Sequence, residues 1–248
     1  MRISGVPIVV AGLLLAPPLA ADSPIDELIA DARGERGART ATSAGGSLEF
    51  GGLVCPAGQG VVEHYVTGFE DGDGGWIESG FGEWEVGAVV TGVHEFCDTV
   101  PAVEPAGVFE GASVMATNLD GCYQNSNQDS SLTRTFDLSD ISGPIALEWH
   151  HWYHIFLTFD RGDVFVEGAL AYAVPDAVAT PDYVVQSVDL SSFAGMPDID
   201  VEFRLHTTTV VNRSGWYLDN VRVLYCSEDI FSDGFETGDT ARWSASSL

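Results

Sequence analysis

Four carboxylates in two distant segments are the clearest candidates for chemistry in this sequence. Glu70, Asp71 and Asp73 lie in a glycine-rich turn, and Asp219 interrupts an apolar run near the C-terminus. Calcium takes about six to eight oxygen ligands, several from carboxylates and others from carbonyls in a turn. We therefore expect Glu70, Asp71, Asp73 and Asp219 to form a structural calcium site. In the simpler alternative, Asp71 and Asp73 only form the turn and Asp219 only accepts backbone N–H groups.

The elements that must position these carboxylates are short β-strands. Residues 51–228 consist of alternating runs separated by turn residues, and helical periodicity of any length is absent after residue 50. Apolar and polar side chains alternate in 201–206, as in a strand with one buried face. The pattern predicts an all-β fold, a two-sheet antiparallel jelly-roll sandwich over residues 51–228. The candidate strands are 61–69, 84–90, 113–117, 132–136, 145–153, 163–166, 183–189, 199–207 and 216–224.

The first and last strands of this block are expected to lie side by side, which would make Glu70 and Asp219 neighbours. The cysteines bear on the same point. In an exported chain, the even number of four cysteines argues for two disulfides, with three possible connectivities. We favour Cys97–Cys122 and Cys55–Cys226, the second because it follows from neighbouring terminal strands. Four free thiols are the alternative.

The ends of the chain have a different composition from the β-rich block. Residues 1–21 contain a positive start, a short apolar run and small residues before a polar break, as a secretory signal peptide does. The apolar run is shorter than the roughly 20 residues that span a bilayer. A retained N-terminal anchor is the alternative. Residues 22–50 are predicted to be a linker with one short helix, and 229–248 an appended tail.

The charge of the chain limits its partners. It has 37 acidic and 10 basic residues, a formal net charge of −27, and all ten basic residues are arginines. Such a surface repels nucleic acid phosphates and anionic lipids. We therefore expect no nucleic acid partner and no membrane insertion after signal cleavage. Divalent cations, neutral glycans and basic protein surfaces are compatible with this charge.

Short motifs follow one another in a recognisable order across residues 65–224. This order resembles the MAM-like jelly-roll domain appended to immune-inhibitor-A-type bacterial metallopeptidases and found in many secreted bacterial proteins. The motifs are Phe69-Glu70-Asp71-Gly72 with Trp76, Trp84-Glu85-Val86-Gly87, Ser113 to Tyr123, Leu132 to Ser139, Leu147-Glu148-Trp149-His150-His151-Trp152, Asp189 to Gly195, Phe203-Arg204 and Gly215-Trp216-Tyr217-Leu218-Asp219-Asn220-Val221.

The resemblance implies a sandwich, often with a structural calcium at the predicted position, and not a peptidase. The peptidase part of such enzymes carries His-Glu-x-x-His, whereas His94-Glu95 here lacks the second histidine. A Gly-x-Ser-x-Gly elbow is also missing from the sequence. The chain departs from the resemblance at 171–182, an Ala/Pro-rich stretch. We expect no catalytic residues.

Aromatic side chains are candidates for ligand binding, because rings stack on the apolar faces of sugars. The candidates are Trp76, Trp84, Trp152 and Tyr183; packing in the core is the alternative for each. His150 and His154 share a strand face but lie about 13 Å apart, too far for one metal ion. We expect the histidine cluster to pack rather than to ligate.

These observations predict a secreted or cell-surface bacterial module for binding or adhesion, non-catalytic and stabilised by calcium. Its ligand would be a glycan or a protein at the cell surface or in the medium. A carbohydrate-binding domain and an accessory protein-interaction domain related to secreted peptidases are the two main alternatives. An enzyme of unrecognised type would need a pocket lined by perturbed carboxylates or histidines.

Overall fold

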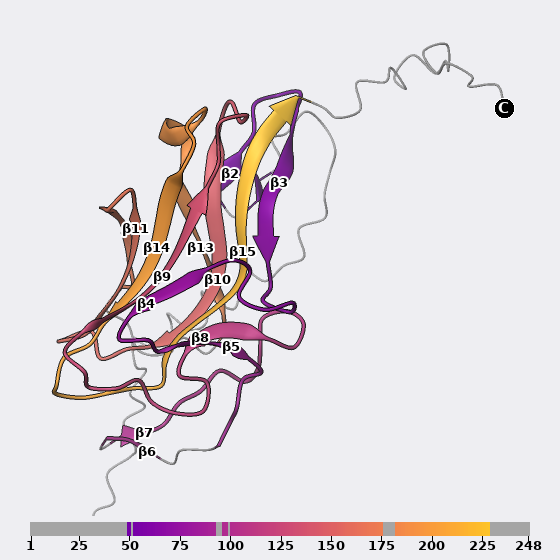
Figure 1. The fold of residues 1–248 in the computed structure, drawn as a ribbon. Coiled ribbons are helices and arrows are strands. Elements are labelled where there is room, and N and C mark those ends of the chain that lie inside the picture. Colours follow the sequence, from indigo (N-terminus) through magenta and orange to yellow (C-terminus); the bar gives the residue numbers. More distant parts are fainter. Residues whose placement is uncertain (1–48, 51, 93–95, 99, 176–181, 229–248) are drawn as a thin grey trace, which may run out of the picture. The chain divides into compact units, whose positions relative to one another are not determined.

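The chain folds into two antiparallel β-sheets that face each other, as the computed structural model shows (Figure 1). The structure describes residues 49–50, 52–92, 96–98, 100–175 and 182–228. Its strands confirm the predicted all-β jelly-roll sandwich. The predicted signal peptide, the tail and all but the last two residues of the predicted linker lie outside the described residues.

The first sheet, which we call sheet 1, is built around the last strand of the fold. Strand β15 pairs with β10 along one side; on the other side it pairs first with β8 and then with β3. In Figure 1, β15 lies between β3 and β10. The strands of sheet 1 are β13 (Val184–Asp189), β10 (Ile145–His154), β15 (Gly215–Glu228), β8 (Val114–Thr117), β5 (Trp84–Gly87) and β3 (Gln59–Thr67).

The second sheet, sheet 2, has a simple order from one edge to the other. Its strands are β12 (Ala169–Ala173), β11 (Arg161–Val166), β14 (Ile199–His206), β9 (Asp129–Phe136) and β4 (Ile77–Gly80). The smaller elements are the pairs β1 (Glu49–Phe50) with β2 (Leu53–Val54) and β6 (Phe96–Cys97) with β7 (Val100–Pro101), and the 3-10 turn η1 (Ser191–Phe193).

The core lies between the sheets and follows the period-two pattern. In β14, Val201, Phe203 and Leu205 are fully buried, and the residues between them are only partly buried. Phe203 meets Trp149 and Trp216 edge-on, with ring centroids 5.3 and 5.7 Å apart. These large rings from both sheets fill the space between the sheets together with the aliphatic side chains. Their size therefore sets the distance between the sheets.

Two disulfides connect distant parts of the chain. Cys55 is bonded to Cys226 across 171 residues, and Cys97 to Cys122 across 25. These are the pairings favoured from the sequence. The first one closes the end of the β3–β15 ladder, where Cys226 pairs with Val61.

Candidate functional site

Asp219 and Glu70 meet on one loop, residues 102–113, which connects β7 to β8. Asp219 is fully buried on β15, and its Oδ2 accepts the backbone N–H groups of residues 109 and 110 at 2.9 and 3.0 Å. Glu70 lies in the turn after β3, and its Oε1 accepts the N–H groups of residues 112 and 113, both at 2.8 Å. The two carboxylates are therefore neighbours, as the pairing of the terminal strands predicted.

A β-bulge in β15 aims Asp219 at this loop. Between two successive pairs, β15 holds one residue more than β10, and Asn220 adopts a left-handed φ of 46°. Leu218 and Val221 consequently both belong to the core between the sheets, while Asp219 points to the outer face of sheet 1. Re-aiming a side chain in this way is a common role of bulges next to sites.

Gly111 allows the same loop to approach the Glu70 carboxylate. Its φ is 72°, and a Cβ at this position would lie only 2.3 Å from Glu70 Oε1. Any other residue would push the loop away and strain the backbone. The contact between the carboxylate and the loop therefore depends on this glycine.

The electrostatic environment of Asp219 is unfavourable for a negative charge. Burial raises the pKa of Asp219 to about 6, the N–H groups it accepts lower that pKa, and the charge of Glu70 raises it. Among the described residues, Asp219 has no ion-pair partner. Two like charges held close together without a cation form an arrangement that a bound cation would stabilise.

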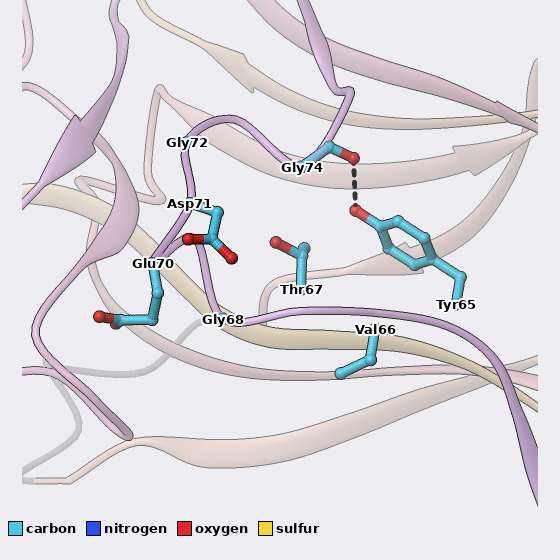
Figure 2. A pocket seen from close by; sticks show the side chains of 8 residues that line it. All are labelled: Tyr65, Val66, Thr67, Gly68, Glu70, Asp71, Gly72 and Gly74. Atoms are coloured by element: carbon cyan, nitrogen blue, oxygen red, sulfur yellow. Dashed lines mark hydrogen bonds between the residues drawn. The ribbon is translucent and has the colours of Figure 1, made fainter.

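Beside this junction is a pocket of about 290 Å³ along the end of β3 and the turn that follows it (Figure 2). The Tyr65 hydroxyl donates to the Gly74 carbonyl at 2.9 Å, which holds the turn against the strand. In Figure 2 the Asp71 carboxylate points toward the Thr67 hydroxyl, whereas Glu70 points away from both. Both carboxylates line the pocket, but Glu70 also binds the 102–113 loop, whereas Asp71 faces Thr67.

The four predicted calcium ligands are thus only partly brought together. Asp73 is used within its own turn, where its Oδ1 accepts the N–H of Gly75 at 2.8 Å. Within the described part of the chain, no three His, Cys, Asp or Glu side chains are placed to share one metal ion. The expectation of a four-carboxylate cluster needs correction: Glu70 and Asp219 meet, while the turn directs Asp71 and Asp73 elsewhere.

The predicted aromatic platform also needs correction, because the three tryptophans are buried. Trp76, Trp84 and Trp152 are exposed by only 3%, 5% and 1% of their surface. Trp76 packs edge-on against core phenylalanines, and Trp84 donates its indole N–H to the carbonyl of Ser130 at 3.1 Å. Their faces contact other side chains and do not form a stacking surface. Tyr183 is the exception, since it is only partly buried.

A groove on the outer face of sheet 2 was not foreseen from the sequence. It has a volume of about 480 Å³ and runs across the edge formed by β4, β9 and β14. Hydroxyls, one carboxylate, one guanidinium and one exposed apolar side chain meet there. The lining residues are Gly75, Ile77, Ser79, Thr133, Arg134, Thr135 and Asp200.

The polar groups of this groove are held in place by their neighbours. The Thr135 hydroxyl donates to Asp200 Oδ1 at 2.5 Å, and Arg134 donates to the Gly74 carbonyl at 2.6 Å. The Arg134 guanidinium also lies 4.2 Å from the centre of the Tyr65 ring, a cation–π contact. Ile77, on the wall of the groove, is 70% exposed. Fixed polar groups beside an exposed apolar side chain suit a ligand with both hydroxyl groups and apolar faces.

The histidines of β10 pack as expected. Burial lowers the pKa of His150 and His154 to about 4, so both are neutral at neutral pH. His150 is stacked on the Phe109 ring, with centroids 3.6 Å apart. His151 is fully buried in the core, where its Nδ1 accepts the indole N–H of Trp216 at 3.1 Å. These contacts indicate packing roles for His150 and His151.

Because His151 is buried and neutral, we expect the folded chain to lose stability at acid pH. Burial lowers its pKa to about 3, so below pH 6.5 the unfolded chain gains a proton that the folded chain does not, and stability is lost as the pH falls. From pH 7 to 4.5 this cost is about 2–3 kcal/mol. His151→Gln, which keeps an acceptor for Trp216, should lose correspondingly less stability over that range. Urea unfolding of both proteins at the two pH values measures the difference, and parallel losses would contradict the assignment.

The fold of this chain and the arrangement of its outer-face sites define a β-sandwich module. No protein-family model matches the sequence. It is similar to Bacillopeptidase F of Bacillus subtilis (strain 168), with 31% identity over 166 residues, which are 65% of this chain and 11% of that protein. The chain therefore spans only a small part of the length of this relative.

Several solved structures are similar to a limited extent. TmCBM61 in complex with beta-1,4-galactotriose is 11% identical, with a TM-score of 0.39 over 65% of this chain and 94% of that one. CBM27-1 of Caldicellulosiruptor saccharolyticus with mannohexaose is 15% identical, with a TM-score of 0.37 over 66% and 96%. A family 35 carbohydrate binding module from Clostridium thermocellum is 13% identical, with a TM-score of 0.32 over 59% and 97%.

One further observation concerns membranes. None of the helices in the described part of the chain has both the length and the apolar character needed to cross a bilayer.

Proposed function

We propose that this chain is a non-catalytic module that binds a neutral glycan outside the cytoplasm. The observation that carries the proposal is the sheet 2 groove, where Ser79, Thr133, Thr135 and Asp200 offer hydrogen-bonding groups beside the exposed Ile77. Sugars combine hydroxyl groups with apolar C–H faces, and such a surface satisfies both. A neutral ligand avoids repulsion by the net charge of −27. Two disulfides support a location in an oxidising compartment, at the cell surface or in the medium.

The glycan proposal predicts that Asp200→Ala weakens binding at least tenfold, because sugar hydroxyls lose a charged acceptor worth about 1.5–3 kcal/mol. Affinity electrophoresis against a panel of neutral polysaccharides identifies a ligand, and calorimetry with that ligand compares the variants. Asp120→Ala is the matched control, since Asp120 is exposed and lies outside the groove. If the panel gives no binder, or if both variants bind equally well, the groove is not a glycan site.

A second candidate function is an accessory domain that contacts proteins, related to secreted peptidases. The similarity to a segment that makes up 11% of Bacillopeptidase F supports it. The motif order of the MAM-like jelly-roll domains is compatible with the same role. Co-purification of the tagged chain with proteins of the producing cell's medium tests this candidate: a specific protein partner is expected, and recovery of the chain alone would count against it.

We also propose that a calcium ion binds where Glu70 and Asp219 meet, as a stabiliser of the fold. The two neighbouring carboxylates and the pKa of Asp219, raised to about 6, support this, and backbone carbonyls of the turn would supply the further oxygens.

Calcium at about 100 times its Kd should then stabilise the chain by about 2.7 kcal/mol, a shift of the melting midpoint of about 5–10 °C. Thermal melts with calcium, with magnesium and with a chelator measure the shift. Asp219→Asn, which keeps an acceptor for the loop, should lose the response to calcium. An unchanged midpoint in the parent chain would refute the site.

A further inference from the structure

The groove of sheet 2 continues as one row of side chains across all five strands of that sheet. The strand registers pair Ile77 of β4 with Thr133 of β9, and Thr133 with Glu202 of β14. They also pair Glu202 with Phe165 of β11, and Phe165 with Leu170 of β12. Residues opposite each other on paired strands share one face of the sheet. We call these five side chains the cross-strand row.

The cross-strand row lies on the outer face of sheet 2. The neighbours of Glu202 in β14 are buried in the core, so Glu202 itself points to the opposite face. Ile77 is 70% exposed and Leu170 is 59% exposed, and they lie on the two edge strands of the sheet. Thr133, Glu202 and Phe165 are partly buried. A ligand on this face can therefore reach apolar groups at both edges and polar groups between them.

The length of the row limits the kind of ligand that would use all of it. Neighbouring strands are about 4.8 Å apart, so the row from Ile77 to Leu170 is about 19 Å long, the length of about four sugar units in an extended chain. The groove reaches only β4, β9 and β14. A disaccharide in the groove would therefore leave Phe165 and Leu170 without a contact.

The polar middle of the row is fixed by hydrogen bonds before a ligand binds. Arg204 donates to both oxygens of Glu202, at 2.8 and 2.7 Å. The Ser131 hydroxyl donates to Glu202 Oε1 at 2.5 Å, and the Arg204 guanidinium lies 4.3 Å from the centre of the Phe165 ring. Side chains that are held in this way lose little conformational entropy on binding. The Arg204 side chain is still 32% exposed, so its remaining N–H groups can donate to a sugar hydroxyl.

The charges on this part of the face are paired with one another. Glu202 is paired with Arg204. Beside them, Asp163 lies opposite Arg204 in the strand register and forms an ion pair with Arg161, with a distance of 3.7 Å from Nε to Oδ2. The middle of the row therefore has almost no net charge, although the whole chain has a net charge of −27. A neutral ligand is the one that such a surface favours.

We propose that the cross-strand row binds a linear, extended and neutral glycan that lies across the strands of sheet 2. One end of the glycan occupies the groove beside Ile77, and the other end packs its apolar C–H faces on Phe165 and Leu170. Hydroxyl groups between the two ends bind Thr133 and Arg204. This inference rests on the proposed function, because it takes the groove to be a glycan site. It adds the shape of the ligand, since a coiled glycan would not follow a straight row from one edge to the other.

The test measures how affinity depends on the length and shape of the glycan. Calorimetry on the full chain compares β-1,4-linked disaccharides and pentasaccharides of glucose, mannose and xylose, with α-1,4-linked maltopentaose as a curved chain of equal length. We expect at least one of the β-1,4-linked pentasaccharides to bind at least tenfold more tightly than its disaccharide, and maltopentaose to show no such gain. In NMR titrations, the backbone amide of Ser79 should shift with both lengths and that of Leu170 only with the pentasaccharide.

Variants at the far end of the row make the result specific. Leu170→Asp should weaken binding of the pentasaccharide at least fivefold and leave binding of the disaccharide unchanged. Leu170→Ser is a milder change and should act in the same direction. Val54→Asp is the matched control, because Val54 is 50% exposed on the short strand β2, which does not belong to sheet 2.

Two results would overturn the cross-strand row: equal affinities for the two lengths, or equal pentasaccharide binding by Leu170→Asp and Val54→Asp. In either case, disaccharide binding that Asp200→Ala weakens would still support a glycan site in the groove. If none of these oligosaccharides binds, the inference is wrong, and the polysaccharide panel decides separately whether the groove binds a glycan of another kind.

Discussion

Asp219→Ala should lower the free energy of unfolding by about 2–4 kcal/mol. The substitution removes the acceptor of three backbone N–H groups, two from the 102–113 loop and that of Asn220. The desolvated charge itself is unfavourable, as the pKa raised to about 6 indicates, and this reduces the loss. Urea unfolding in the presence of a chelator measures the effect without a contribution from any metal ion.

Asp219→Asn provides the matched comparison. The asparagine side chain keeps one oxygen acceptor and has no charge. This variant should therefore lose less than half as much stability as Asp219→Ala. If both substitutions cost less than about 1 kcal/mol, the size of one ordinary hydrogen bond, the carboxylate does not fasten the loop.

Removal of the Cys55–Cys226 disulfide should have the largest effect on stability. The bond closes 171 residues of chain, and in the chain-entropy model its loss costs about 5 kcal/mol. A Cys55→Ala/Cys226→Ala double variant should therefore unfold at a much lower urea concentration than the parent chain when both are measured without a reductant.

The second disulfide is the internal reference for this prediction. Cys97–Cys122 spans only 25 residues, so a Cys97→Ala/Cys122→Ala variant should lose about 3–4 kcal/mol. Equal losses for the two double variants, or a larger loss for the shorter bridge, would show that native contacts of the cysteines outweigh the restriction of the unfolded chain.

Much of the architecture follows from the period-two pattern. The predicted strands overlap β3, β5, β8, β9, β10, β11, β13, β14 and β15, because these carry runs of β-forming or alternating residues. Strands β4 and β12 were missed, since Ile77–Gly80 is exposed throughout and Ala169–Ala173 contains mainly small residues. β12 falls partly in the stretch 171–182 that departs from the MAM-like resemblance. Without a contrast between two faces, a strand gives no signal.

The candidate sites were predictable only in part, for a related reason. Alternation shows that His150, Trp152 and His154 share one face of β10, but not that the 102–113 loop covers this face and buries Trp152. The proximity of Glu70 and Asp219 could be predicted because both flank the pairing of β3 with β15. The backbone N–H groups that they bind belong to the 102–113 loop, and a loop has no periodic sequence pattern from which its position could be predicted.

The pairing of sheet 1 also determines the order of events during synthesis. β15 contributes the ladder partners of β3, β8 and β10, yet it is the last of these strands to leave the ribosome. A nascent chain that ends before Gly215 lacks the strand that joins β3, the β5–β8 pair and the β10–β13 pair into one sheet. Sheet 1 is therefore completed late, and a chain that stops within β15 leaves β3, β8 and β10 without their shared partner.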